Sequence, residues 1–236
     1  MPQIGTRRLA LAAILATLYA VLRLIPVTSL VGINSTLTMA ETFSPLVGMI
    51  LGPFVGALSV FVGSFLVVVL GRPLVFDGLD FLPGVLAAMT AGLALRGKTY
   101  WVVALSAALI LIYDVDPLSS PVIFVGGVPV PFLWMHILAA VTYFAAARIG
   151  GIGSRLHIVA TVFVSTMNAH VAGSIMFENV LVRVNHALSP SALAGTWNFV
   201  FYLYPIERVF FTVVGAIIAL AVLRAVPKER LQQLRG

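Results

Sequence analysis

The chain has 236 residues, of which 61% are hydrophobic and only 9% are charged. A soluble globular domain carries about 25% charged residues, so this composition excludes an ordinary soluble domain and predicts an integral membrane protein. The absence of cysteine excludes disulfides, thiolate metal sites and thiol nucleophiles. The net charge of +6 comes from basic residues scattered at the ends of apolar segments, a distribution that does not favour nucleic-acid binding.

Eight apolar segments are predicted as helices. In chain order they cover residues 9–25, 40–52, 53–71, 82–96, 100–113, 131–148, 157–182 and 201–224. A membrane span needs about 20 residues, and the second, fourth and fifth segments are shorter than that. We therefore expect an all-α, polytopic transmembrane helix bundle of six to eight spans. It would form a single integral membrane domain over residues 1–236, with a short basic cytoplasmic tail at 226–236.

Alanines recur every four residues in the first segment, at Ala12, Ala16 and Ala20, after the basic pair Arg7-Arg8. Residues four apart share one face of a helix, and in lipid a face of small residues lets another helix approach closely. The spacing fits docking to a separate subunit and packing within the bundle equally well.

Small residues also form stripes in the second, third and fourth segments, where packing within the bundle is the favoured interpretation. These stripes contain Gly48, Gly52 and Gly56, then Gly63, and finally Gly84, Ala88 and Gly92.

The distribution of charge predicts the orientation. With the N-terminus in the cytoplasm, ten of the fourteen Lys and Arg residues fall on the cytoplasmic side, and seven of the eight acids, all but Glu229, fall outside. The positive-inside rule therefore predicts N-in and C-in, with an even number of spans. The cytoplasmic group comprises Arg7, Arg8, Arg96, Lys98, Arg148, Arg155, Arg224, Lys228, Arg230 and Arg235. The longer connections then lie outside, at about 26–39, 72–81, 114–130 and 183–200.

Four polar side chains lie in the seventh segment. His170, Ser174 and Glu178 follow one another at spacing four, so they share a face, and Asn168 lies near the middle of the segment. Polar groups at membrane depth usually face the bundle interior or a cavity. An interhelical hydrogen bond explains Asn168 equally well, whereas His170 with Glu178 favours a site.

Charged and aromatic residues flank other segments. Glu41 opens the second segment, and Glu207-Arg208 at the start of the eighth is predicted to be a pair of interfacial charges. An aromatic belt is the favoured interpretation of the aromatic residues near the outer ends, and stacking on a planar ligand is the alternative. These aromatic residues are Tyr113, Trp134, Trp197, Tyr202 and Tyr204.

Enzyme motifs are missing from the sequence. It has no Gly-x-Ser-x-Gly, no His-Glu-x-x-His and no Walker A sequence, so it is not itself a P-loop ATPase. Two carboxylates, Asp77 and Asp80, lie in one outer connection. We expect no catalytic residues, no resident metal and no cofactor.

The first hundred residues resemble the substrate-binding S component of energy-coupling factor transporters. The resemblance lies in the alanine ladder of the first segment and in residues 43–66, which read like two helices joined at Gly52-Pro53. It continues in residues 80–93, which are similar to the fourth helix of that family. The resemblance implies that Ala12, Ala16 and Ala20 dock on a scaffold transmembrane subunit coupled to two cytoplasmic ATPases. It also implies a lid at residues 28–40, including Asn34, over a solute bound from outside. Six helices are usual in that family, and eight segments here depart from it.

The sequence thus predicts a multi-pass protein of the cell membrane that captures a small, vitamin-like solute for an ATP-driven importer. The predicted site residues are Asn34, Glu41, Asn168, His170, Glu178 and Trp197. The expected partners are the solute, the scaffold and ATPase subunits and the lipid bilayer, with no nucleic acid. Three alternatives stay open. They are an autonomous secondary transporter or channel, a membrane enzyme on lipid-linked substrates using Asp77 and Asp80, and a structural subunit of a membrane complex.

Overall fold

The computed structural model describes residues 5–33 and 35–226, which form eight α-helices and two short β-hairpins. The first half contains α1 (Thr6–Leu22), β1 (Pro26–Ser29), β2 (Thr36–Thr38), α2 (Ala40–Leu51), α3 (Pro53–Val69) and α4 (Leu82–Leu95). The second half contains α5 (Thr99–Val115), β3 (Val122–Val125), β4 (Val128–Pro131), α6 (Trp134–Ile149), α7 (Arg155–Glu178), a π-helical turn η1 (Asn179–Val184) and α8 (Pro190–Ala225). The predicted helical bundle is confirmed. Most of the predicted basic tail, residues 227–236, lies outside the described residues.

The eighth helix begins earlier than the sequence analysis predicted. Residues 190–200 were expected to belong to an outer connection, and they form the first three turns of α8. Ser189 is the N-cap, its hydroxyl accepting a hydrogen bond from the backbone N–H of Ala192, and Pro190 occupies the first turn. Serine before proline is a strong helix start, and it outweighs the low apolar content of this segment.

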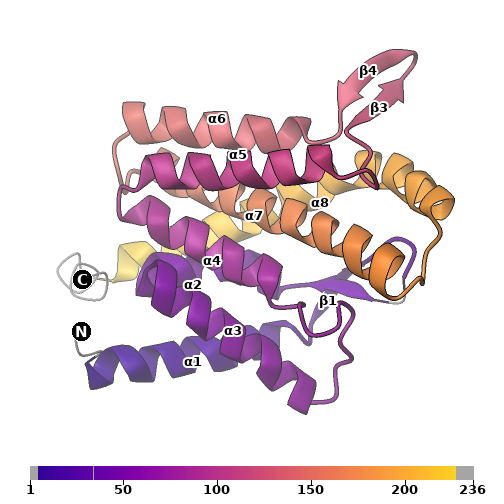
Figure 1. Ribbon diagram of the computed structural model, residues 1–236. Helices are drawn as coiled ribbons and strands as arrows, with labels where there is room; N and C mark the ends of the chain where they lie inside the picture. Colours follow the sequence, from indigo (N-terminus) through magenta and orange to yellow (C-terminus); the bar gives the residue numbers. More distant parts are fainter. Residues whose placement is uncertain (1–4, 34, 227–236) are drawn as a thin grey trace.

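The helices run side by side, and the bundle has two distinct ends (Figure 1). The beginning of α1 and the end of α8 lie at one end, here called the terminal end. Both hairpins lie at the other, here called the hairpin end. Strands β1 and β2 pair antiparallel, as do β3 and β4, whose Gly126-Gly127 turn has the positive φ angles that a two-residue hairpin favours.

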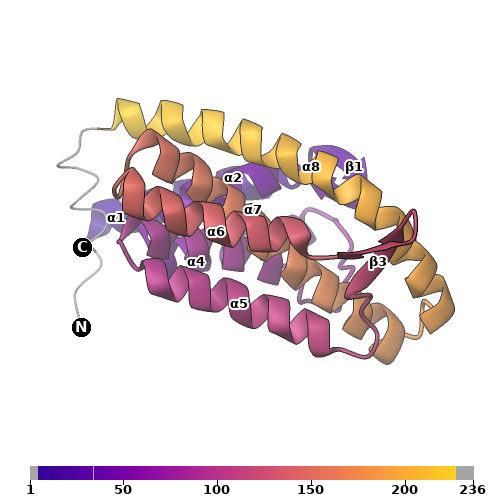
Figure 2. The ribbon, with the colours of Figure 1, turned by 90° about the horizontal axis from the view of Figure 1, so that it is seen from above.

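Helix α7 is the central element of the bundle. It packs against α2, α4, α5, α6 and α8, and Figure 2 shows α8 along one side of the molecule and α5 along the other. Most of its residues are buried. Polar side chains on α7 therefore lie inside the bundle, as the sequence analysis expected.

The glycine stripes pack helices of the same bundle together, which confirms that interpretation. A Cβ on Gly48 would lie 1.8 Å from the carbonyl oxygen of Ala88, and one on Gly92 would lie 2.4 Å from the backbone nitrogen of Pro53. The backbones of α2, α3 and α4 thus approach at distances that only glycine permits.

The alanine ladder of α1 also faces a helix of its own chain. Ala16 and Ala20 are each only 3% exposed, and Gly63 of α3 lies against the carbonyl oxygen of Ala16. Ala12 is half-buried. Packing within the bundle therefore accounts for Ala16 and Ala20, which are not available to a second protein while α1 lies on α3.

Two helical stretches are long and apolar enough to cross a membrane. They are Arg155–Val184, with 30 residues, and Pro190–Ala225, with 36 residues. The other apolar helices are shorter, and α2, with 12 residues, is about 18 Å long at 1.5 Å per residue. The second, fourth and fifth segments, which the sequence analysis found shorter than a full span, form helices of 12, 14 and 17 residues.

Candidate functional site

A cavity of about 130 Å³ lies at the hairpin end. Its walls come from the β1–β2 hairpin, the start of α2, the connection between α3 and α4, the second half of α7 and the middle of α8. Six charged side chains line it, namely Arg23, Glu41, Arg72, Asp80, Glu207 and Arg208. Segments distant in the sequence therefore build one polar site.

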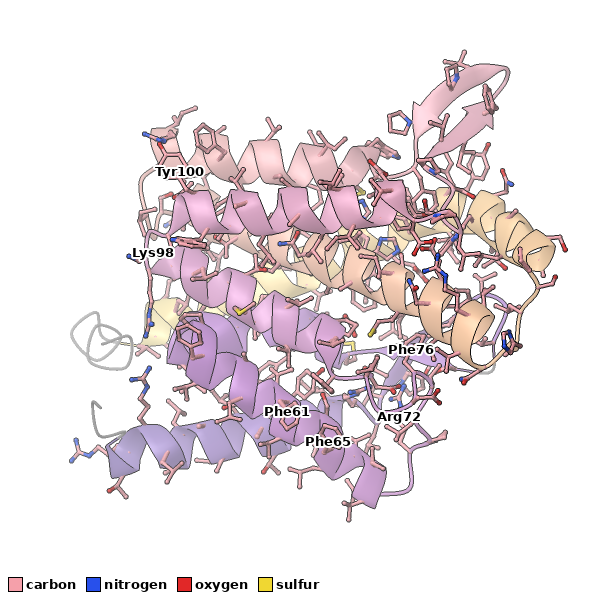
Figure 3. All side chains as sticks on the ribbon, in the orientation of Figure 1. Phe61, Phe65, Arg72, Phe76, Lys98 and Tyr100 are labelled. Carbon is pink, nitrogen blue, oxygen red and sulfur yellow. The ribbon has the colours of Figure 1, made fainter. Side chains whose placement is uncertain are left out.

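Arg72 fixes the β1–β2 hairpin over this cavity. Its Nη2 donates a hydrogen bond of 2.9 Å to the carbonyl oxygen of Thr36 in β2, and its Nη1 donates to the carbonyl oxygen of Arg23 at the end of α1. Figure 3 shows Arg72 and Phe76 at the hairpin end, opposite Lys98 and Tyr100. Burial, and then the positive charge of Arg23, lower the pKa of Arg72. The guanidinium of Arg72 is thus occupied by backbone carbonyl groups.

Asp80 holds the connection that leads into α4. Its two carboxylate oxygens accept hydrogen bonds from the backbone N–H groups of Val75 and Phe76, at 2.9 and 3.0 Å. Asp77 adopts a positive φ of 49° and accepts a long hydrogen bond, 3.4 Å, from Asn185. The part of the chain that the structure describes holds no cluster of three His, Asp or Glu side chains placed to bind a metal. Asp80 therefore has a structural role in the loop.

Arg208 is buried in the wall that α8 contributes. It is 2% exposed, its Nη2 lies 3.7 Å from the nearer carboxylate oxygen of Glu207, and its guanidinium lies over the ring of Phe211 at 4.9 Å. Its Nε finds no hydrogen-bond partner among the described residues. The prediction that Glu207 and Arg208 are interfacial charges is wrong for Arg208, because α8 turns this face into the bundle.

Stacked rings lie next to Arg208 on the same side of the cavity. His170 of α7 and Tyr204 of α8 stack with centroids 4.9 Å apart, and His170 Nδ1 lies 3.0 Å from His136 Nε2 of α6. The hydroxyl of Tyr204 donates a hydrogen bond of 2.8 Å to the carbonyl oxygen of Phe132. This network joins α6, α7 and α8 at the depth of the cavity.

Trp197 is part of an internal aromatic cluster. It is 3% exposed and packs against Phe132 and Phe177, with centroids 5.4 and 5.5 Å away, while it also lines the cavity. The aromatic-belt interpretation is therefore wrong for Trp197, Tyr113 and Tyr204, which are buried. Tyr202, at 59% exposed, has the exposure that a belt residue requires.

The structure brings three of the predicted site residues to this cavity, Glu41, His170 and Trp197. Asn168 and Glu178 do not line it. The side-chain amide of Asn168 donates a hydrogen bond of 3.2 Å to Thr90 Oγ1, which is the interhelical bond weighed as the alternative. Glu178 is fully buried beside Trp197, two turns beyond His170. Asn34 lies outside the described residues.

The arginines of the cavity were not among the predicted site residues. Arg208 was predicted to be an interfacial charge, and no role was predicted for Arg23 or Arg72. The available signal was the position of Glu207-Arg208 inside an apolar helix, because charges within such a segment are costly and usually functional.

No family model, no curated protein and no solved structure matches the chain. The geometry and charges of the cavity therefore carry the functional conclusions that follow.

Proposed function

We propose that the chain is the membrane-embedded substrate-binding subunit of an ATP-driven importer. It captures a small solute from outside in the cavity at the hairpin end and passes it on through a scaffold subunit and two ATPases. The observation that carries the proposal is the partly open cavity, lined by six charged side chains, beneath a hairpin that directly follows the first helix. The resemblance to energy-coupling factor S components implies a lid at that point.

The membrane part of the proposal is supported by composition, charge and helix length. The chain is 61% hydrophobic, and two helical stretches are long enough to cross a bilayer. The terminal end carries basic residues such as Arg8, Arg96 and Arg148, which the positive-inside rule assigns to the cytoplasm. In this orientation, with six to eight segments embedded, the cavity opens toward the outside of the cell membrane.

A scaffold subunit would contact a face of α1 other than the buried ladder. Ala10, Ala13 and Thr17 lie on the exposed side of α1. Small residues there would let a partner helix approach closely while α1 stays packed on α3. We therefore propose this exposed face in place of Ala16 and Ala20.

Filling the cavity tests the solute-binding role. Gly173 of α7 lines the cavity, and a Cβ there would meet nothing closer than Pro83 Cγ at 3.8 Å. Gly173→Leu should therefore remove solute that copurifies with gently extracted protein, as measured by mass spectrometry, without unfolding it. The matched control is Gly195→Leu, on α8, where a Cβ would meet nothing within 4 Å. Equal solute content in both variants and the wild type would contradict the proposal.

Placing a large side chain on the exposed face tests the partner. Ala13→Trp should abolish uptake in cells that hold the complete importer while solute still copurifies with the subunit. Ala16→Trp does not test docking, because it would separate α1 from α3. If Ala13→Trp still takes up solute, the partner subunit does not contact this face of α1.

The stacked histidines favour a second candidate, an autonomous secondary transporter. His136 and His170 share a partly buried hydrogen bond next to Arg208, and chains of ionisable groups between helices can relay protons. This candidate predicts solute movement in liposomes that contain the purified chain alone and a pH gradient. The importer proposal predicts none.

A further inference from the structure

Most charged groups of the cavity already have partners in the protein. Arg72 donates to two backbone carbonyl groups, Asp80 accepts from two backbone N–H groups, and Arg23 Nη1 donates a long hydrogen bond of 3.4 Å to the carbonyl oxygen of Asp80. Buried polar groups in proteins are usually satisfied in this way. Arg72 and Asp80 are therefore largely satisfied by the protein, and Arg23 is held at the cavity wall by one long hydrogen bond.

Arg208 differs, because its hydrogen-bonding capacity is largely unused. Its side chain is 2% exposed, its Nε has no hydrogen-bond partner among the described residues, and its contact with the Glu207 carboxylate, at 3.7 Å, is beyond normal hydrogen-bond length. An arginine so placed in a cavity wall binds carboxylate groups well, since its planar fork matches their geometry.

Glu41 is the complementary group. It lines the same cavity from the first turn of α2, its charge acts on both Arg72 and Arg208, and none of the hydrogen bonds found between described residues ends on its carboxylate. A carboxylate can accept from a ligand ammonium or N–H group.

The charges of the cavity also sum to zero. Three arginines and three carboxylates line it, so the formal count is 3 − 3 = 0 with His170 neutral. A ligand with a net charge would bring an uncompensated charge into a site whose walls are largely apolar, which is unfavourable. A ligand that carries one charge of each sign would satisfy Arg208 and Glu41 and keep the balance.

The size and remaining walls of the cavity limit the rest of the ligand. A cavity of about 150 Å³ binds benzene, so about 130 Å³ has room for a group close to one six-membered ring. Phe76, Phe177 and Trp197 contribute apolar wall suited to such a group.

We infer that the solute is a compact zwitterion, whose anionic group binds Arg208, whose cationic group binds Glu41 and whose small apolar or single-ring group fills the cavity. An α-amino acid with an apolar side chain has this chemistry. The inference rests on the proposed function and names the class of solute for the same site.

Three small probes with the same apolar group and different charges test it. Valine carries both charges, isobutylamine lacks the carboxylate and 3-methylbutanoate lacks the ammonium group. In equilibrium dialysis against purified protein at neutral pH, valine should bind about tenfold or more tightly than either analogue, the loss expected for one charged hydrogen bond. An analogue that binds as tightly as valine, or binding of none of the three, overturns the inference.

Two variants assign the charges. Glu41→Gln should remove the preference for valine over 3-methylbutanoate, and Arg208→Lys should reduce the preference for valine over isobutylamine. Asp114→Asn, an exposed carboxylate at the end of α5 outside the cavity, is the control and should leave both preferences unchanged. If Arg208→Lys does not fold, Glu41→Gln decides alone, and an unchanged preference in it overturns the inference.

These outcomes are separable from failure of the proposed function. A solute that copurifies, is displaced by Gly173→Leu and carries a net charge would refute the zwitterion and support the binding subunit. If no copurifying solute is lost in Gly173→Leu, the proposal that the chain is a substrate-binding subunit is itself refuted.

Discussion

Arg183 binds Asp116 through two contacts, with Nη2 2.6 Å from Oδ1 and Nη1 3.0 Å from Oδ2. The same carboxylate accepts hydrogen bonds from the side chain of Asn179 and from the backbone N–H of Leu118. Asp116 follows α5 and precedes the β3–β4 hairpin, whereas Arg183 lies in η1 at the end of α7. The pair therefore joins two segments of the hairpin end that are distant in the sequence.

The ion pair predicts a pH dependence of stability. Burial alone would raise the pKa of Asp116, but the hydrogen bonds from Leu118, Asn179 and Arg183 lower it overall. A depressed carboxylate pKa contributes stability above the unfolded value of about 3.9, and this contribution is lost as the pH falls further, through the folded pKa. Asp116→Asn should therefore lower the melting temperature at neutral pH, and the two melting curves should converge in acid.

The size of that effect is limited, because Arg183 is 44% exposed. Exposed ion pairs contribute about 1 kcal/mol or less. The measurement is thermal unfolding in detergent across the acid range. A difference between wild type and Asp116→Asn that stays constant into strong acid would contradict the assignment.

Gly48→Ala should be strongly destabilising. The added Cβ would lie 1.8 Å from the carbonyl oxygen of Ala88, and backbone atoms of α4 cannot move aside without separating the helices. Overpacking of this kind costs about 1–3 kcal/mol or more. Gly195→Ala is the matched control, because that helical glycine has open space around it and alanine favours helix by about 1 kcal/mol. Equal stability of the two variants would show that α2 and α4 pack less closely.

Tyr204→Phe removes the hydroxyl that donates to Phe132 and leaves a buried carbonyl group unsatisfied. The expected loss is about 1–3 kcal/mol of unfolding free energy. Tyr202→Phe, two residues earlier on the exposed side of α8, should cost nothing measurable. Denaturant titration of both variants in detergent checks the difference, and equal midpoints would argue against the hydrogen bond.

Arg72→Met should loosen the β1–β2 hairpin while the helices stay folded. The substitution keeps most of the side chain but removes the donors to Thr36 and Arg23. We expect faster protease cleavage and faster amide exchange within residues 26–38. Arg148→Met, at the terminal end, removes an arginine without touching the hairpin and is the control. Unchanged exchange in Arg72→Met would show that the hairpin is held by other contacts.

The helices could be predicted from the sequence because each is an apolar run bounded by glycine, proline or charge. The glycine contacts of α2, α3 and α4 followed from spacing alone, because residues four apart must share a face. The start of α8 was missed because its first turns, after Ser189-Pro190, are less apolar than the rest, although the capping signal was present.

The cavity could be predicted only in part. Glu41 and His170 were predicted because a polar residue at the edge of or within an apolar segment usually faces the bundle interior or a cavity. Arg208 and Arg72 were not predicted. The burial of Arg208 depends on which face α8 turns toward α7, and the role of Arg72 depends on the contact between the connection after α3 and strand β2. Both are long-range relationships that no local pattern encodes. The burial of Ala16 rather than its exposure depends likewise on which side of α1 the third helix occupies.

The length of α8 has a consequence for how a solute reaches the cavity. Its 36 residues extend about 54 Å at 1.5 Å per residue, whereas the hydrocarbon layer of a bilayer is about 30 Å thick. Arg208 lies 17 residues before Ala225, or about 26 Å along the axis, so an α8 that is anchored with Ala225 at the cytoplasmic boundary brings Arg208 close to the opposite water boundary. Thr196 and Trp197, about 42 Å from Ala225 along the axis, then lie beyond the headgroup layer on the outer side. On the proposed function, a solute would therefore reach Arg208 directly from water without dissolving in the lipid.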